Sequence, residues 1–284
     1  MGGGLRKAYS YLQLLSIDVI LGALLSGMMA ARLLAVQMPA YWYWVLPLSV
    51  WVIYTTDHLM DARRLKENAH TPRHLFHYRY FKRIGLVWGL GILLCTLYVP
   101  WIISAKVLYF GLGMGALVLV HLGLVYLIGD RIAWFIHKEL GVGAIYAAGV
   151  WGAPLVLTEG PIASWMLCAA AQFFLLALLN LLIFSFYERE TDALDQHTSF
   201  VRALGEKRTR QLIVLLGISI VLLGLWGGFE AAVPPFYVIV QLIYSLMLAL
   251  LLWVFFDERR FRFAERYRLW GDGVFLFPLL SLLL

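Results

Sequence analysis

Long apolar runs, separated by short charged or Gly/Pro-containing segments, dominate this sequence. About 20 predominantly apolar residues are enough to cross a lipid bilayer. The chain has 284 residues, of which 62% are hydrophobic and only 14% charged, whereas soluble domains carry about 25% charged residues. This composition excludes an ordinary soluble fold. We expect an all-α, polytopic membrane protein that forms a single integral-membrane domain over residues 1–284.

The boundaries of the apolar runs predict nine transmembrane helices. The last run, Gly271–Leu284, is short for a bilayer, so eight spans followed by a re-entrant tail is the alternative. The basic N-terminal flank resembles that of a signal peptide, but the following apolar run has no clear cleavage site and is interpreted as a span. The predicted spans cover residues 8–36, 40–62, 82–103, 106–128, 139–158, 162–187, 209–231, 235–256 and 270–284.

The basic residues predict how these helices are oriented. Of the 23 Lys and Arg residues, all except Arg32 and Lys106 fall in the N-terminus or in the loops after the second, fourth, sixth and eighth predicted helices. By the positive-inside rule these segments face the cytoplasm, and we expect a bacterial inner membrane. The net charge of +6 is spread among hydrophobic segments. Membrane lipids are therefore the expected counter-charge, and no nucleic-acid partner is expected.

Two cytoplasmic helix ends carry carboxylates in register. Asp57 and Asp61, in YTTDHLMDARR, are four residues apart at the end of the second predicted helix. Glu188 and Asp192, in FYERETDALDQ, have the same spacing at the end of the sixth. A spacing of four places both carboxylates of a pair on one helical face. The repetition predicts a bundle in which these two helices face each other across a central cavity.

Carboxylates close to hydrocarbon are costly, so they usually line an aqueous or metal-filled interior. Four converging carboxylates would repel one another, and Mg²⁺ would relieve this repulsion. Mg²⁺ prefers one or two protein carboxylates together with waters and substrate phosphates. The pattern therefore favours a site for a phosphorylated, membrane-soluble substrate, although solvated helix ends would explain either pair alone.

The helix count, the orientation and the two acidic motifs resemble the UbiA superfamily of intramembrane prenyltransferases, across the whole chain. The first motif of that family usually reads N-D-x-x-D-x-x-x-D. Here IYTTDHLMD retains Asp57 and Asp61, while Ile53 and Tyr54 stand in place of the Asn and the first Asp. The second family motif, D-x-x-x-D, is matched by ERETD with Glu188 and Asp192.

The resemblance implies a nine-helix bundle in which the four motif carboxylates are catalytic and bind Mg²⁺. In that family the metal binds a prenyl diphosphate. Ionisation of the prenyl diphosphate gives an allylic cation, and a lipophilic or aromatic acceptor attacks this cation. Metal ions and Lys/Arg side chains suit the neutralisation of a leaving diphosphate, and the rings of two tyrosines could stabilise the cation. The further substrate-binding candidates are Arg73, Lys138 and Arg202 as clamps, and Tyr54 and Tyr187 for the cation.

Other polar residues within the predicted spans need partners. Asp18, about ten residues into the first predicted helix and thus roughly 15 Å deep, is expected to be neutral, paired or facing the cavity, and is a substrate-binding candidate. Asn180 lies two turns before Glu188 and is another, although it and Gln172 also suit interhelical hydrogen bonding. The histidines around residues 70–77 are interpreted as part of a solvated loop rather than as a metal site.

Two other functions remain open. A CDP-alcohol phosphotransferase also uses aspartates four residues apart, but its motif requires D-G-x-x-A-R followed by G-x-x-x-D-x-x-x-D, and this order is absent. A non-enzymatic, UbiA-like membrane protein that binds or transports a lipid or a phosphorylated lipid fits the composition equally well. Activity with any prenyl diphosphate would separate this alternative from the enzyme.

Overall fold

A computed structural model describes residues 12–68, 71–125, 138–194, 199–230 and 232–283. Over these residues the secondary structure is entirely helical, which confirms the predicted all-α class. The longer helices are α2 (Ile17–Leu33), α3 (Trp42–Leu65), α5 (Phe81–Leu97), α7 (Ala105–Gly123), α8 (Lys138–Leu157), α9 (Ser164–Leu194), α11 (Glu206–Gly228) and α12 (Phe236–Phe256).

Shorter helices connect or extend the long ones. The α-helical segments are α4 (Pro72–Arg79), α6 (Val99–Ile102), α10 (Phe200–Leu204), α13 (Glu258–Arg262), α14 (Arg266–Gly273) and α15 (Leu280–Leu283). The 3₁₀ segments are η1 (Lys66–Asn68), η4 (Phe263–Glu265) and η5 (Val274–Leu279).

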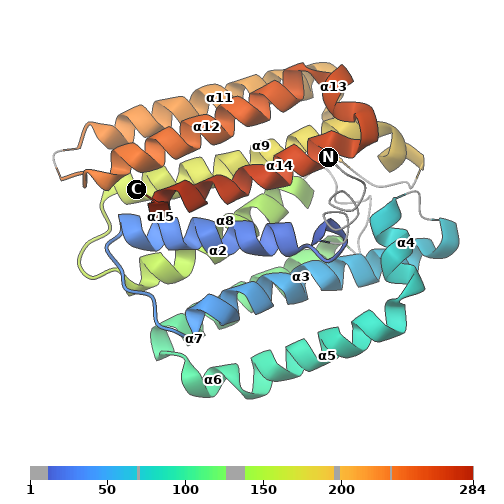
Figure 1. Ribbon diagram of the computed structural model, residues 1–284, viewed down its shortest axis with the longest axis horizontal. Coiled ribbons are helices and arrows are strands. Elements are labelled where there is room, and N and C mark those ends of the chain that lie inside the picture. Colours follow the sequence, from blue (N-terminus) through green and yellow to red (C-terminus); the bar gives the residue numbers. More distant parts are fainter. Residues whose placement is uncertain (1–11, 69–70, 126–137, 195–198, 231, 284) are drawn as a thin grey trace.

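The long helices lie roughly side by side in a bundle (Figure 1). Helix α9 lies at its centre and packs against α8, α11 and α12, while α2 packs against α3, α8 and the 3₁₀ segment η5. Helices α5 and α6 lie at the lower edge in Figure 1, and α11 and α12 at the upper edge. Helix α4 and helix α13 lie at the same end of the bundle, although about 180 residues separate them in the sequence.

Six helical segments are long and apolar enough to cross a membrane: α5 with α6, α7, α8, α9, α11 and α12, among the described residues. The chain is therefore an integral membrane protein by composition and helix length. The expected count of nine is not confirmed. Helix α2 has only 17 residues, α3 is rich in aromatic and polar residues, and the C-terminal segment is divided into α14, η5 and α15.

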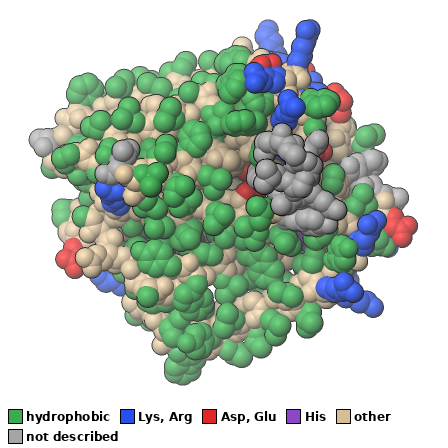
Figure 2. All heavy atoms as spheres, in the orientation of Figure 1, with side chains coloured by type: hydrophobic (Ala, Val, Ile, Leu, Met, Phe, Trp, Pro, Cys, Tyr) green, Lys and Arg blue, Asp and Glu red, His purple; other side chains and the backbone are tan. Residues whose placement is uncertain are grey.

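The outer surface agrees with a lipid environment. Hydrophobic side chains cover most of the face in Figure 2, and charged side chains lie mainly toward the ends of the bundle. Large apolar side chains are strongly exposed on several helices: Leu86 on α5, Leu119 on α7 and Trp226 on α11 are 69%, 72% and 70% exposed. Large apolar side chains exposed on this scale are unusual for a soluble monomer. In a bilayer they contact acyl chains instead.

Amide side chains form hydrogen bonds between helices in the interior of the bundle. The Nε2 of Gln172 on α9 donates to the carbonyl of Ile220 on α11 and to Oε1 of Gln241 on α12, both at 2.9 Å. Gln241 Nε2 donates back to Gln172 Oε1 at 2.8 Å. Amides that bond across helices satisfy polar atoms that lipid cannot. The predicted interhelical role of Gln172 is thus confirmed.

Local sequence signals position α4 beside the end of α3. Thr71 is the N-cap of α4 and its Oγ1 accepts from the backbone N–H of His74 at 3.4 Å. Pro72 follows at the first helical position, where its missing N–H costs no hydrogen bond. Helix α4 packs against α3. It thereby brings His74 close to Asp61 and His77 close to His58 of α3.

Candidate functional site

The carboxylates of α3 have basic partners from two other helices. The Oδ2 atom of Asp61 lies 3.4 Å from Nε2 of His74 on α4. The Oδ1 atom of Asp57 lies 3.9 Å from Nζ of Lys138, the first residue of α8. Both carboxylates are on the same side of α3, as their one-turn spacing predicts. The end of α3 is therefore an acidic face covered by α4 and α8.

The carboxylates of α9 occupy a similar position. Oε1 of Glu188 lies 2.7 Å from Nη2 of Arg268 on α14, and each of these side chains is 19% exposed. Asp192, one turn further on, is partly buried and interacts electrostatically with Glu188, Glu139 and Lys138. Its backbone carbonyl accepts from Nη1 of Arg202 at 3.4 Å, so Arg202 contacts the backbone of the α9 motif.

Basic side chains connect the two carboxylate pairs. Lys138 interacts electrostatically with Asp57 and Asp61 of α3 and with Asp192 of α9. Arg73 on α4 interacts with Glu188 of α9 and with Arg268. The pKa of Arg73 is lowered, first by burial and then by the neighbouring charge of Arg268. Neighbouring guanidinium groups need anions nearby, and Glu188, Asp18 and Asp272 supply them.

A second acidic layer lies deeper, and sequence reasoning identified only half of it. Asp18 at the start of α2 and Asp272 in α14 are 4% and 8% exposed. They interact electrostatically with each other and with Arg73 and Arg268. Asp272 and Arg268 were not among the predicted site residues. Their four-residue spacing on α14 repeats that of the acidic motifs and was the available signal.

Asp18 lies closer to the helix end than its sequence position predicted. A helix beginning at residue 8 would have placed it about ten residues deep. In the structure Ser16 has a φ of +56°, which separates the helical residues 12–14 from α2, and Asp18 falls in the first turn of α2. Its Oδ1 accepts from the backbone N–H of Val19 at 2.9 Å. Asp18 therefore lies in the first turn of α2, where it interacts electrostatically with Arg73 and Arg268, and its role at the site stays a prediction.

Asn180 and Tyr54 line the approach to this deeper layer. Asn180 is 4% exposed and packs against Gly271 of α14, directly before Asp272. Tyr54 lies one turn before His58 on α3, with their ring centroids 6.4 Å apart. Its phenol interacts electrostatically with Asp18, Asp57 and Asp272. Tyr54 therefore lies between the α3 carboxylates and the deeper acids.

Tyr187 does not face the carboxylates. Its hydroxyl donates to the backbone carbonyl of Val254 on α12 at 2.6 Å. Its ring stacks on that of Tyr267, with centroids 4.4 Å apart and an interplanar angle of 8°. These contacts fix Tyr187 between α9, α12 and α14. Among the predicted residues it is the one whose contacts point to packing.

The histidines beside the α3 carboxylates are buried, so their interpretation as a solvated loop was wrong for those that the structure describes. His58 and His77 are 5% and 2% exposed, and their ring centroids lie 4.8 Å apart. Burial lowers the pKa of His74 to about 4 and also lowers that of His77. At neutral pH these imidazoles are uncharged. His70 lies outside the described residues.

The resulting site is a network of alternating charges at one end of the bundle, built by α2, α3, α4, α8, α9 and α14. Within the described part of the chain, no three Asp, Glu, His or Cys side chains gather as metal ligands. The carboxylates occur as pairs with basic side chains between them. No protein-family model matches this chain, and no curated protein or solved structure gives a significant match.

Proposed function

We propose that this chain is an intramembrane prenyltransferase of the UbiA type, which moves an isoprenoid chain from a prenyl diphosphate to a lipophilic or aromatic acceptor. The observation that carries the proposal is the linkage of two carboxylate pairs, on α3 and α9, through Lys138, with Arg73 and Arg268 beside Glu188 of the second pair. A diphosphate needs both cationic side chains and metal-binding carboxylates. The network supplies both at the end of an apolar bundle.

The donor set fits Mg²⁺ shared with a phosphorylated substrate better than Mg²⁺ enclosed by protein alone. Mg²⁺ commonly takes one or two carboxylates, waters and phosphate oxygens. Each acidic motif would provide two carboxylates one helical turn apart: Asp57 with Asp61, and Glu188 with Asp192. Substrate phosphate and water would complete the shell. Bound there, the ion would neutralise charge on the leaving diphosphate.

The chain's own basic residues would bind and orient the diphosphate. Arg268 and Lys138 already pair with carboxylates, and a phosphate group is a stronger bidentate partner for a guanidinium. Arg73 adds a third cation, which interacts electrostatically with Glu188 and Arg268. The ring of Tyr54, beside the α3 carboxylates, would present its negative face to an allylic cation. The apolar helices that surround the site would accommodate the isoprenoid chain and limit access of water.

A second function is binding or transport of a phosphorylated lipid without chemistry. The pairing of Glu188 with Arg268 and of Asp57 with Lys138 favours it, because carboxylates already neutralised by bases have less affinity for a metal ion. In this case the cations would bind the headgroup, and the acids would pair with the cations again when the lipid leaves.

The experiment uses purified protein in detergent with Mg²⁺, geranyl, farnesyl and longer prenyl diphosphates, and a panel of phenolic acceptors. Diphosphate binding is measured by calorimetry and inorganic diphosphate release by a coupled assay. The enzyme requires Mg²⁺-dependent release that Asp57→Asn and Asp192→Asn abolish. The matched control is Glu190→Gln, because Glu190 is 75% exposed and 3.9 Å from Arg262, outside the network.

The outcomes separate the two functions. Release with wild type and Glu190→Gln, but not with Asp57→Asn, supports the transferase. Binding without release for every donor and acceptor supports the lipid-binding function instead. Absence of both binding and release contradicts both. Asp195, a second residue off the shared face of the α9 motif, lies outside the described residues, so Glu190 is the preferred control.

A further inference from the structure

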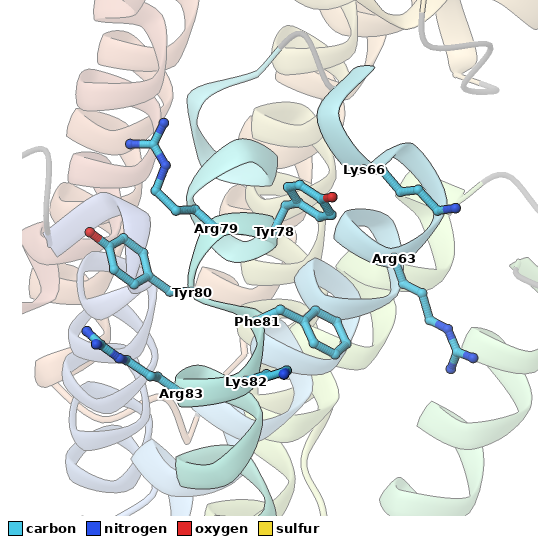
Figure 3. A pocket seen from close by; sticks show the side chains of 8 residues that line it. All are labelled: Arg63, Lys66, Tyr78, Arg79, Tyr80, Phe81, Lys82 and Arg83. Atoms are coloured by element: carbon cyan, nitrogen blue, oxygen red, sulfur yellow. The ribbon is translucent and has the colours of Figure 1, made fainter.

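A cavity of about 660 Å³ lies between the end of α3 and the junction of α4 with α5, separate from the network of carboxylates. Figure 3 shows its lining side chains, which come from the end of α3, η1 and the α4–α5 junction. Among the residues that the structure describes, the lining consists of five basic and three aromatic ones: Arg63, Lys66, Arg79, Lys82 and Arg83, with Tyr78, Tyr80 and Phe81.

The basic residue of α3 that lines the cavity lies on a different face of that helix from its carboxylates. Arg63 follows Asp61 by two residues, which turns it about 200° around the helix axis. Arg79 follows the buried His77 by two residues in the same way. These two basic side chains of the cavity therefore point away from Asp61 on α3 and from His77 on α4. A ligand in the cavity would not compete with one held by Asp57 and Glu188.

The basic residues of the cavity differ from several other basic residues of the chain in having no carboxylate partner among the described residues. Within the part of the chain that the structure describes, none of the five forms an ion pair. The carboxylate of Glu67, on η1 beside the cavity, accepts instead from the hydroxyl of Tyr78 at 3.4 Å. By contrast, carboxylate partners are present for Lys138, Arg189, Arg210, Arg262 and Arg268. Five cations gathered in this way attract an anion from outside the chain.

An apolar stripe begins where the basic cavity ends. Helix α5 starts at Phe81, and its leucines 86, 90, 93 and 97 are 69%, 57%, 51% and 62% exposed. Their spacings of four, three and four residues place them on one face of the helix, and Arg83 lies one turn before the first of them on that same face. Cations at the head of an exposed leucine stripe match a molecule with an anionic head and acyl chains.

We propose that the cavity formed by Arg63, Lys66, Arg79, Lys82 and Arg83 is a binding site for one anionic phospholipid, with its phosphate among the basic side chains and an acyl chain along α5. Basic pockets at the cytoplasmic ends of membrane helices recognise acidic headgroups. The aromatic side chains Tyr80 and Phe81 suit the headgroup–acyl boundary, where amphipathic rings lie. The site is independent of the proposed prenyl transfer.

The test compares wild type with two variants that remove the same charge. The cavity variant is Arg79→Gln/Lys82→Gln/Arg83→Gln. The control is Lys207→Gln/Arg208→Gln/Arg259→Gln, whose residues are exposed and basic but do not line the cavity. Purified proteins are mixed with phosphatidylglycerol or phosphatidylcholine in detergent. Bound lipid is counted by native mass spectrometry, and melting temperature is followed with each lipid and without any lipid.

We expect wild type and the control to retain phosphatidylglycerol in preference to phosphatidylcholine. In the cavity variant this preference should be at least about tenfold weaker, because three charges at the membrane surface have been removed. An equal loss in the control contradicts the proposal, because the attraction is then diffuse. So does the same affinity of wild type for both lipids. Stabilisation by inorganic phosphate alone, equal to that by phosphatidylglycerol, also contradicts it. Equal melting temperatures of the three proteins without lipid verify that all are folded.

Discussion

Glu188 on α9 and Arg268 on α14 form a 2.7 Å ion pair that joins helices 80 residues apart in the sequence. Both side chains are 19% exposed, so water screens the pair less than a surface pair. Arg268 also interacts electrostatically with Arg73 and Asp272. The pair therefore ties one acidic motif to the basic residues from α4 and α14.

Glu188→Gln is expected to lower the free energy of unfolding by about 2 kcal/mol, between the values typical of exposed and of buried pairs. The reason is that Arg268 then faces Arg73 without its main anion. The double variant Glu188→Gln/Arg268→Gln should cost less than the sum of the single variants. Thermal unfolding in detergent measures each cost, and strictly additive costs would show that the two residues do not interact.

Gly271 permits the close approach of α14 to α9. A Cβ at this position would lie 2.5 Å from Oδ1 of Asn180 and from the ring of Phe184, whereas at Gly273 it would meet nothing within 4 Å. Gly271→Ala should therefore displace α14, with Asp272, and cost about 1–3 kcal/mol. Gly273→Ala is the matched control and should have a small effect. Equal melting temperatures of the two variants would contradict the close packing of α14 on α9.

Sequence patterns predicted the features that depend on local spacing. Apolar runs predicted the helical, membrane-spanning character, which the structure confirms. The interhelical role of Gln172 followed from an amide in an apolar span and is also confirmed. The four-residue spacing predicted that Asp57 and Asp61 share a face of α3. In each case, residues within a turn or two of one another carry the information.

The features that were missed depend on contacts between distant segments. Hydropathy assigned Trp270–Leu284 to a ninth span, and this concealed that Arg268 and Asp272 meet Asp18, about 250 residues away. The positive φ of Ser16 interrupts the helix just before α2, and no glycine in the sequence marks this position. The burial of His77 arises from the packing of α4 on α3, which the polarity of the segment did not indicate.

The partly buried His74, whose side chain is 15% exposed, predicts a pH-dependent stability. Its pKa is about 4 in the folded protein because burial disfavours the charged form, and about 6.5 when unfolded. The unfolded state thus binds more protons between these values. Stability should be fully present above pH 6.5 and should fall as the pH is lowered toward 4, by at most about 3 kcal/mol for this group.

His77 has a lowered pKa as well and acts in the same direction. Melting temperatures of wild type and His74→Gln at pH 7.5 and pH 5 test the expectation. The variant should lose part of the decrease at pH 5. The exposed glutamate variant Glu190→Gln should retain all of it. A wild-type melting temperature that rises on acidification would contradict the burial of a neutral imidazole.

Tyr54 offers the most direct test of the proposed chemistry, because it stands where the resembled family has an acid. It is electrostatically coupled to Asp57, Asp18 and Asp272, so Tyr54→Asp would add a third carboxylate on the face of α3 that holds the other two. If the native site is a weakened form of the family's, this variant should increase Mg²⁺ affinity and raise the rate of diphosphate release several-fold.

Tyr54→Phe is the control, because it keeps the ring and adds no ligand. Mg²⁺ titration by calorimetry gives a readout that does not depend on activity. Unchanged metal affinity in Tyr54→Asp would show that the face of α3 is not a metal site, and the lipid-binding function would then be the better account of the paired charges.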